Sequence, residues 1–226
     1  MSCGQIALRE LGVKIDTYYA SEVDRFAIEQ TQYNFPDTVQ IGDVRDVDAR
    51  KLGHVDLLIG GSPCQSFSFA GKRAGMSTKE KEEIHTLERY LELKHAGFEF
   101  EGQSYLFWEY MRILHELRET NPGVMFFLEN VEMGEKWERV LSDAIGLRGV
   151  HINSALVSAQ VRKRIYWTNI STAVDAQGHM CTDIPLPEDR GILLRDILQD
   201  DAEVDESYYL KDETVKTLLE HKKRSE

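Results

Sequence analysis

The sequence lacks paired cysteines and long apolar runs, and these absences exclude several classes of protein. Its only cysteines are Cys3, Cys64 and Cys181, and no two of them stand at the spacing of zinc ligands. We therefore expect neither a disulfide framework nor a bound metal, and one of the thiols is free to be reactive. No apolar run reaches the roughly 18 residues of a membrane-spanning helix. No secretory pattern follows Met1, so an intracellular protein without a membrane partner is expected.

Positive charge is also scarce, since the net charge is −12. Contacts to nucleic-acid phosphates need Lys and Arg, so this deficit argues against such a partner. The charge is uneven, however: residues 183–213 carry 11 acidic and three basic side chains, which leaves −4 for the rest of the chain. A local basic groove can still form from Lys72, Arg73, Arg162, Lys163 and Arg164. Net charge therefore does not decide the partner.

Short apolar runs alternate with amphipathic stretches, which is typical of an α/β fold with a mostly parallel sheet flanked by helices. The strands are predicted near Lys14–Ala20, Thr38–Gly42, Val55–Gly60, Val124–Leu128, Val150–Val157 and Arg164–Asn169, the last two as a candidate hairpin. The helices are predicted at Gly4–Leu11, Asp24–Tyr33, Ser104–Glu119 and Glu135–Ile145. Between them, Thr78–Glu99 is charged and helical in character. It is either a solvated helix in a long loop or an insertion that contacts DNA or a partner.

The first chemical feature is a cysteine just beyond a buried strand, in the run Gly60-Gly61-Ser62-Pro63-Cys64. Open α/β sheets bind ligands at the carboxyl ends of their strands. The two glycines allow a tight turn and the close approach of a ligand, and Pro63 stiffens the backbone before the thiol. A thiolate at Cys64 would be a strong nucleophile. On its position alone, a buried and inert cysteine is the more ordinary interpretation, because free cysteines are commonly small core residues.

The second feature is an acid at the end of another apolar strand, Glu129 in Phe126-Phe127-Leu128-Glu129. A carboxylate there must be desolvated, paired or functional. If the two strands are neighbours, Glu129 and Cys64 leave the sheet at the same edge. The alternative is an acid that caps the next helix.

The third feature is a row of alternating polar side chains, Gln160, Arg162 and Arg164. On an extended segment these residues share one face. Paired guanidiniums can hold a phosphate or a base carbonyl, although a solvated basic surface has the same pattern.

The fourth feature is a set of turn residues suited to a nucleoside cofactor. Gly4 opens the first helix, Glu22-Val23 follows the strand predicted near Lys14–Ala20, and Asp43-Val44 follows the strand predicted near Thr38–Gly42. If the first strand of the fold is missing, these are its second and third strands. An acid after the second strand can hold ribose hydroxyls, and one after the third can accept from an adenine amino group.

In this order and spacing, from Met1 to about Ile170, these segments resemble the cytosine-5 DNA methyltransferase family. Pro63-Cys64-Gln65, Glu129-Asn130-Val131 and the Gln160, Arg162 and Arg164 face carry the resemblance. The segments at residues 20–23 and 43–45 look closest to phage-encoded members and to the eukaryotic de novo branch, whereas the insertion at residues 78–103 and the segment at 153–170 look like a phage or prophage enzyme.

The resemblance implies a Rossmann-like class I S-adenosylmethionine-dependent methyltransferase fold, with duplex DNA as partner and a flipped cytosine as substrate. By similarity, Cys64 attacks carbon 6 of the base, Glu129 stabilises or protonates N3, and Arg162 and Arg164 hold the base and the loop around Cys64. The implied S-adenosylmethionine pocket is lined by Gly4, Glu22, Val23, Asp43, Val44, Pro63 and Leu106. The implied location is the cytoplasm of a bacterium that hosts a phage or prophage.

We expect residues 1–170 to form the catalytic domain with its first strand missing, and residues 171–226 to begin the connection to a target-recognition region. On this reading the chain is truncated at both ends. Three alternatives stay open: an inactive regulatory paralogue, a tRNA cytosine-5 methyltransferase and a dinucleotide-binding oxidoreductase. Against the last, no G-x-G-x-x-G fingerprint is seen.

Overall fold

The computed structural model describes residues 2–63 and 76–223. Its helices are α1 (Cys3–Glu10), α2 (Arg25–Asn34), α3 (Leu87–His95), α4 (Leu106–Thr120), α5 (Glu135–Ile145) and α6 (Asp212–Lys223). Its strands are β1 (Tyr19–Ala20), β2 (Val39–Gln40), β3 (Leu57–Gly61), β4 (Met125–Val131), β5 (Val150–Asn153), β6 (Lys163–Thr168), β7 (Thr172–Val174) and β8 (Met180–Thr182). This order confirms the predicted α/β class.

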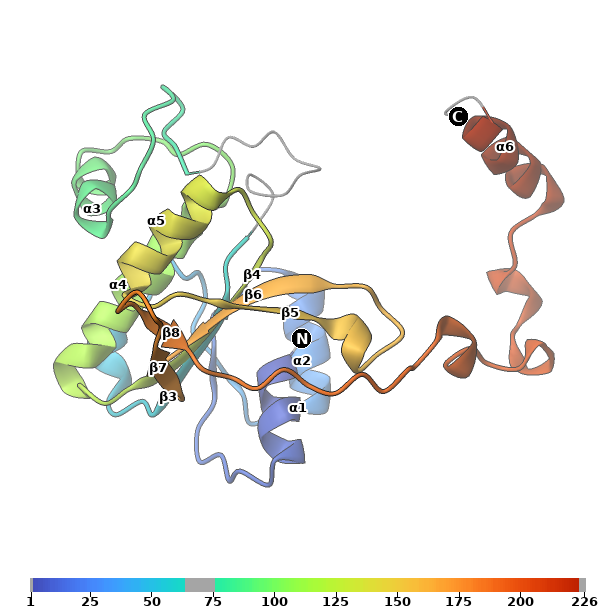
Figure 1. Ribbon diagram of the computed structural model, residues 1–226, viewed down its shortest axis with the longest axis horizontal. Coiled ribbons are helices and arrows are strands. Elements are labelled where there is room, and N and C mark those ends of the chain that lie inside the picture. The colour runs from blue at the N-terminus through green and yellow to red at the C-terminus, as the bar shows by residue number, and fades with distance from the viewer. Residues whose placement is uncertain (1, 64–75, 224–226) are drawn as a thin grey trace. The chain divides into compact units, whose positions relative to one another are not determined.

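The strands pair in both directions. β1 and β2 form a parallel pair, and a second sheet has the order β3-β4-β6-β5. In that sheet β3 and β4 are parallel, whereas β6 runs antiparallel to both β4 and β5 (Figure 1). The predicted hairpin of the last two strands is therefore confirmed. β7 and β8 form a further antiparallel pair, which the sequence did not indicate.

The core packs on the second sheet and includes buried residues of α3, α4 and α5. Alternate residues of β4 point to opposite faces, so Phe126 and Leu128 are fully buried on one of them. α4 buries Phe107, Trp108 and Leu114 at helical spacing. Burial of each large apolar side chain stabilises the fold by roughly 1.5–3 kcal/mol, so this packing fixes α4 against the strands.

Local signals account for the ends of several helices. The carboxylate of Asp24 accepts from the backbone N–H of Ala27 at 2.8 Å and starts α2. Asn121 and the proline after it end α4. Gly146, with a φ of 82°, takes the left-handed conformation that ends α5.

The charged segment Thr78–Glu99, which lies in what we call the insertion (residues 78–103), is less helical than its composition predicts. Only Leu87–His95 forms a helix, capped by Thr86, whose hydroxyl accepts from Arg89 N–H at 3.2 Å. The preceding charged run turns back on itself instead, with a bridge between Ser77 and Glu83. A second bridge joins Thr78 to Phe100, so the two ends of the insertion lie side by side. It provides hydrogen-bond partners for main-chain groups that would otherwise be unpaired.

The described chain divides into two compact units. The first comprises Met1–Asn153 with Arg162–Leu186, and it holds the sheets and α1 to α5. The second comprises Ser154–Val161 with Pro187–Glu226, and it holds α6 and short 3-10 turns. Among the described residues, no helix combines the length and the apolar character needed to cross a membrane.

Candidate active site

Strands β3 and β4 end side by side at one rim of the sheet. The parallel register places Gly61 opposite Glu129. One residue further along each strand, the side-chain amide of Asn130 donates to Ser62 Oγ at 2.9 Å. The two strands are thus neighbours, which the sequence argument for a shared edge took as its condition. Pro63 follows, half-buried, and Cys64 lies outside the described residues.

Glu129 forms ion pairs with both of the arginines that the sequence singled out. Its Oε1 lies 2.7 Å from Arg164 Nε and accepts from Arg162 Nη2 at 3.1 Å. The Glu129 side chain is 26% exposed, so one side of the carboxylate remains open to solvent. One acid and two guanidiniums thus form a charged cluster at this rim.

The antiparallel register explains how the cluster forms. Val131 pairs with Arg164, and Glu129 pairs with Tyr166. Directly opposed residues share a face, and residues two apart on a strand share it as well. The guanidinium of Arg164 therefore reaches Glu129 diagonally, and Arg162 follows on the same face. Gln160 belongs to the second compact unit.

Two neighbouring side chains, those of Asn153 and Tyr166, interact with residues of this cluster. Arg162 N–H donates to the side-chain oxygen of Asn153 at 3.1 Å, which fixes the start of β6. Burial raises the pKa of the Tyr166 phenol, and the nearby Glu129 carboxylate raises it further. Tyr166 therefore stays protonated at neutral pH.

The two glycines of β3 make room for different neighbours. A Cβ on Gly60 would stand 2.6 Å from the ring of Tyr110, and one on Gly61 would stand 3.2 Å from Glu129 Oε2. Gly60 thus permits the close packing of α4 on the strand, and Gly61 leaves space for the carboxylate. Both lie within the strand, so the tight turn inferred from the sequence is not the reason for them.

The loops after β1 and β2 are tied together. Ser21 Oγ donates to the carbonyl of Gly42 at 2.7 Å, which joins the loop of Glu22 to that of Asp43. Glu22 Oε1 accepts from the N–H groups of Val23 and Asp24, at 2.8 and 3.0 Å. Two acids therefore stand at the carboxyl ends of two neighbouring parallel strands, the position expected of a nucleoside site.

Asp43 is held by the arginine two residues after it. Arg45 donates to the carboxylate through its backbone N–H and its Nε, each at 2.9 Å, and through Nη2. These hydrogen bonds lower the pKa of Asp43 to about 2. The group is therefore an ionised acceptor at neutral pH. Val44, next to it, packs against the core.

The other expected pocket residues lie at the beginnings or ends of elements. Gly4 stands in the first turn of α1, and a Cβ there would come within 2.8 Å of Tyr18 Oη and 3.0 Å of Ile59 Cδ1. This glycine lets α1 approach the face of β3 opposite to α4. Leu106 is the first residue of α4 and is half-buried.

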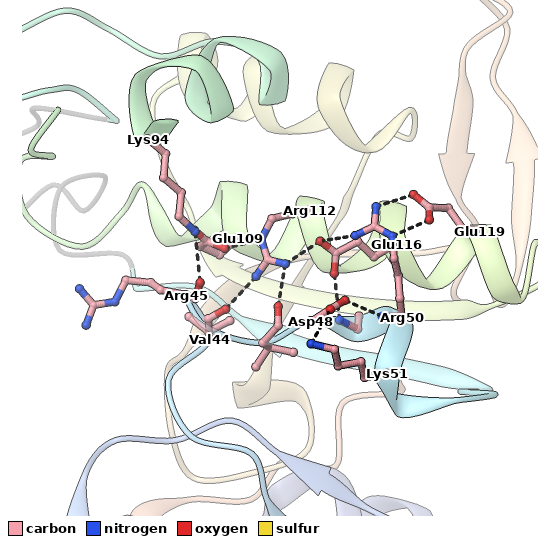
Figure 2. Close-up of polar contacts among 12 residues, drawn as sticks. Val44, Arg45, Asp48, Arg50, Lys51, Lys94, Glu109, Arg112, Glu116 and Glu119 are labelled. Carbon is pink, nitrogen blue, oxygen red and sulfur yellow. Dashed lines mark hydrogen bonds and ion pairs between the residues drawn. The ribbon is translucent and has the colours of Figure 1, made fainter. Parts of the chain in front are cut away.

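The sequence did not single out the charged residues of α4 and α3 that contact the Asp43 loop. Arg112 and Lys94 donate to the main-chain carbonyls of this loop, and Glu109 joins the two cations (Figure 2). Acids three residues before and four residues after Arg112 on one helical face were the available signal. That pattern is also common on solvated helices, so by itself it does not indicate a contact with a loop.

Comparison with known proteins identifies the family of the chain. Residues 2–139 match the family described as C-5 cytosine-specific DNA methylase. The orphan methyltransferase M.Rho11sI of Bacillus phage rho11s is 45% identical over 73 residues, covering 31% of this chain and 14% of the phage protein. The orphan methyltransferase M.SPBetaI of Bacillus phage SPbeta is 26% identical, covering 96% of this chain and 58% of its own length.

A solved structure supports the fold. The crystal structure of a DNMT2 mutant from Spodoptera frugiperda has a TM-score of 0.57 at 21% identity and covers 92% of this chain and 59% of that one. At this identity the likeness shows a shared fold only. The chain spans less than two thirds of the length of each of these relatives.

Proposed function

Because the chain belongs to the C-5 cytosine-specific DNA methylase family, we propose that it transfers a methyl group to carbon 5 of a cytosine flipped out of duplex DNA. The observation that carries this proposal is the cluster of Glu129, Arg162 and Arg164 at the end of β4, beside Gly61 at the end of β3. In sequence, Cys64 follows Gly61 by three residues. Extrusion is needed because a stacked base hides its ring face from a thiol.

The residues at the ends of β1 and β2 fit S-adenosylmethionine. Asp43 is an ionised acceptor suited to an adenine amino group, and Glu22 is an acceptor suited to ribose hydroxyls. Val23 is 69% exposed beside Glu22 and offers apolar contact for a base. The proposed pocket residues are Gly4, Glu22, Val23, Asp43, Val44, Pro63 and Leu106. When bound, this cofactor supplies an electrophilic methyl group and leaves as S-adenosylhomocysteine.

The chain's own residues would carry the steps on the base. The Cys64 thiolate adds to carbon 6, which places the displaced electron pair on carbon 5 for bond formation with the methyl group. Glu129 holds N3, so that negative charge does not build up on the ring. Loss of the carbon-5 proton to water then restores the ring double bond and expels the thiolate. Arg162 and Arg164 hold Glu129 and offer guanidinium donors to the base carbonyl or a phosphate.

Covalent trapping tests the central step. We expect a duplex with 5-fluorocytosine at the target to form an adduct with the protein in the presence of S-adenosylmethionine, because fluorine at carbon 5 cannot leave as a proton. Cys64→Ser should abolish the adduct, and Cys181→Ser, the matched control for a thiol elsewhere, should keep it. An adduct that survives Cys64→Ser contradicts the proposal. Complete absence of an adduct with the unaltered chain on random-sequence duplexes favours an inactive paralogue.

A second comparison tests the acid. Glu129→Gln keeps the shape of the side chain but removes its charge, so we expect single-turnover transfer to slow by roughly 100-fold or more. DNA affinity, from a gel-shift titration, should change far less. Glu132→Gln is the control, because Glu132 contacts His151 and not the arginines. Equal loss of transfer and of DNA affinity would remove the assigned role.

Substrate class is tested by offering tRNA and duplex DNA side by side. We expect methyl incorporation into DNA alone. A thermal-shift screen separates the remaining alternative: S-adenosylmethionine should raise the melting temperature, and stabilisation by NAD alone would point to an oxidoreductase.

A further inference from the structure

The loop that follows β2 rests on a cluster of buried charges contributed by α4. Arg112 donates from Nη1 to Val47 O at 2.7 Å and from Nη2 to Val44 O at 3.0 Å. Its guanidinium is itself bound by two acids on the same helix, Glu109 at 2.7 Å and Glu116 at 2.7 Å (Figure 2). Glu109 is fully buried and Arg112 is 13% exposed. The guanidinium of Arg112, which its two acids hold in place, therefore fixes the backbone of the loop.

The insertion supplies a second cation to the same loop. Lys94, near the end of α3, donates to Arg45 O at 3.2 Å and forms an ion pair with Glu109 Oε1 at 2.5 Å. The hydroxyl of Tyr90, also on α3, donates to the same carboxylate. Glu109 thus joins the cation of the insertion to the cation of α4, and α3 and α4 hold the loop together (Figure 2).

These contacts converge on the main chain directly after Asp43. The carbonyls of Val44, Arg45 and Val47 are the ones that receive them. Burying cations and acids carries a desolvation cost that is offset only when the geometry is well satisfied, as it is here. A surface turn needs no such support merely to satisfy its carbonyls, since water would do so. The arrangement is better explained as one that fixes where the Asp43 carboxylate stands.

We propose that Lys94 and Arg112 are positioning residues for adenine recognition by Asp43, so that the insertion, residues 78–103, forms part of the cofactor site. This inference rests on the proposed function, because it takes the adenine amino group as the donor to Asp43. It also gives the insertion a role separate from contacts to DNA. Lys94 acts from outside the pocket, through the loop backbone.

The test compares two lysines of the insertion. Lys94→Met removes the hydrogen bond to the loop, whereas Lys79→Met removes an exposed ion pair with Glu99 and leaves the hydrogen bonds to the Val44, Arg45 and Val47 carbonyls in place. In the absence of any ligand, we expect Lys94→Met to raise hydrogen exchange of the amides at residues 43–47, and Lys79→Met to leave it unchanged. This readout is independent of catalysis.

Ligand discrimination provides the second measurement. The unaltered chain should prefer S-adenosylhomocysteine to its inosine analogue, which lacks the adenine amino group, and Asp43→Ala should remove that preference. We expect Lys94→Met to weaken S-adenosylhomocysteine binding on the order of 10-fold, with most of the preference lost. KM for the methyl donor should rise similarly while kcat at saturation stays near that of the unaltered chain. Arg112→Lys, which keeps a cation on α4, should retain more of the preference than Arg112→Met.

The outcomes separate the two proposals. If the unaltered chain binds no S-adenosylhomocysteine, the proposed function fails and this inference fails with it. If the chain binds with the expected preference, but Lys94→Met matches Lys79→Met in hydrogen exchange and in discrimination, only the positioning role is overturned. A lowered kcat with an unchanged preference would also overturn it.

Discussion

Gly60→Ala is the sharpest test of how α4 packs against the sheet. The added methyl carbon would stand 2.6 Å from two atoms of the Tyr110 ring. Carbon atoms in contact normally lie about 3.5–4.0 Å apart, so the overlap approaches roughly 1 Å. Tyr110 is buried within the core cluster, and its ring cannot swing away without moving α4. Gly60 must therefore stay small for the helix to remain in place.

The magnitude follows from two opposing contributions. Overpacking of a core typically costs about 1–3 kcal/mol. Replacing glycine stabilises by about 0.4–1 kcal/mol through the unfolded chain. We expect a net loss of about 1–2 kcal/mol in the free energy of unfolding, which lowers Tm by roughly 2–8 °C in a chain of this size. Urea titration followed by circular dichroism, together with a thermal scan, measures both quantities.

Two companion variants make the result decisive. The double variant Gly60→Ala with Tyr110→Leu should be no less stable than Tyr110→Leu alone, because the smaller side chain leaves room for the methyl. No hydrogen bond is lost in that swap, since the Tyr110 hydroxyl has no partner among the residues that the structure describes. If Gly60→Ala is as stable as the unaltered chain, or if Tyr110→Leu gives no rescue, the packing argument is wrong.

Three further predictions concern the rim and the loops. In Gly61→Ala the added methyl carbon would stand 3.2 Å from Glu129 Oε2 and shift the carboxylate by a few tenths of an ångström. Single-turnover methyl transfer should therefore fall several-fold while Tm changes little, and unchanged transfer would contradict this. Arg45→Met should raise the pKa of Asp43 from about 2 toward its ordinary value, which carboxyl NMR can follow. A lowered folded-state pKa stabilises the fold above the unfolded-state pKa, and this contribution is lost as the pH falls. The loss of stability between about pH 4 and 2 should therefore be smaller in the variant. Asn169→Ala removes an amide that donates to one main-chain carbonyl and accepts from one main-chain N–H of the β4 segment, so unfolding free energy should drop by about 1–3 kcal/mol in urea titrations; a neutral result would mean that water replaces both contacts.

The sequence predicted the elements whose residues carry their own periodicity. α5 begins at Glu135 and ends at Ile145 as expected, because apolar spacing and the terminal glycine act locally. The strand expected from Lys14 was wrong in length, since pairing with β2 covers only Tyr19 and Ala20. Pairing depends on what lies alongside, which composition does not specify. For the same reason the charged run of the insertion was misread as helix.

The rim of the site was predictable for a related reason. Two-residue alternation placed Arg162 and Arg164 on one face, and the apolar run before Glu129 placed it at the end of a strand. The support beneath the Asp43 loop was not predictable, since Lys94 lies 49 residues from the carbonyl of Arg45 and Arg112 lies 68 from that of Val44. Local patterning marks the acids around Arg112 but does not indicate which loop Arg112 contacts.

The reversed direction of β6 has a consequence for how tolerant this rim is to change. A strand that ran the same way as β4 would present its first residues at the opposite end of the sheet, far from Glu129. Running backwards, β6 delivers its opening arginine to the acid through a single hairpin rather than a long crossover. Sliding β6 by one residue along β4 would turn Arg164 to the other side and leave Glu129 without its nearest countercharge. A one-residue change in the β4–β6 register would therefore separate the acid from this arginine while leaving most of the sheet intact.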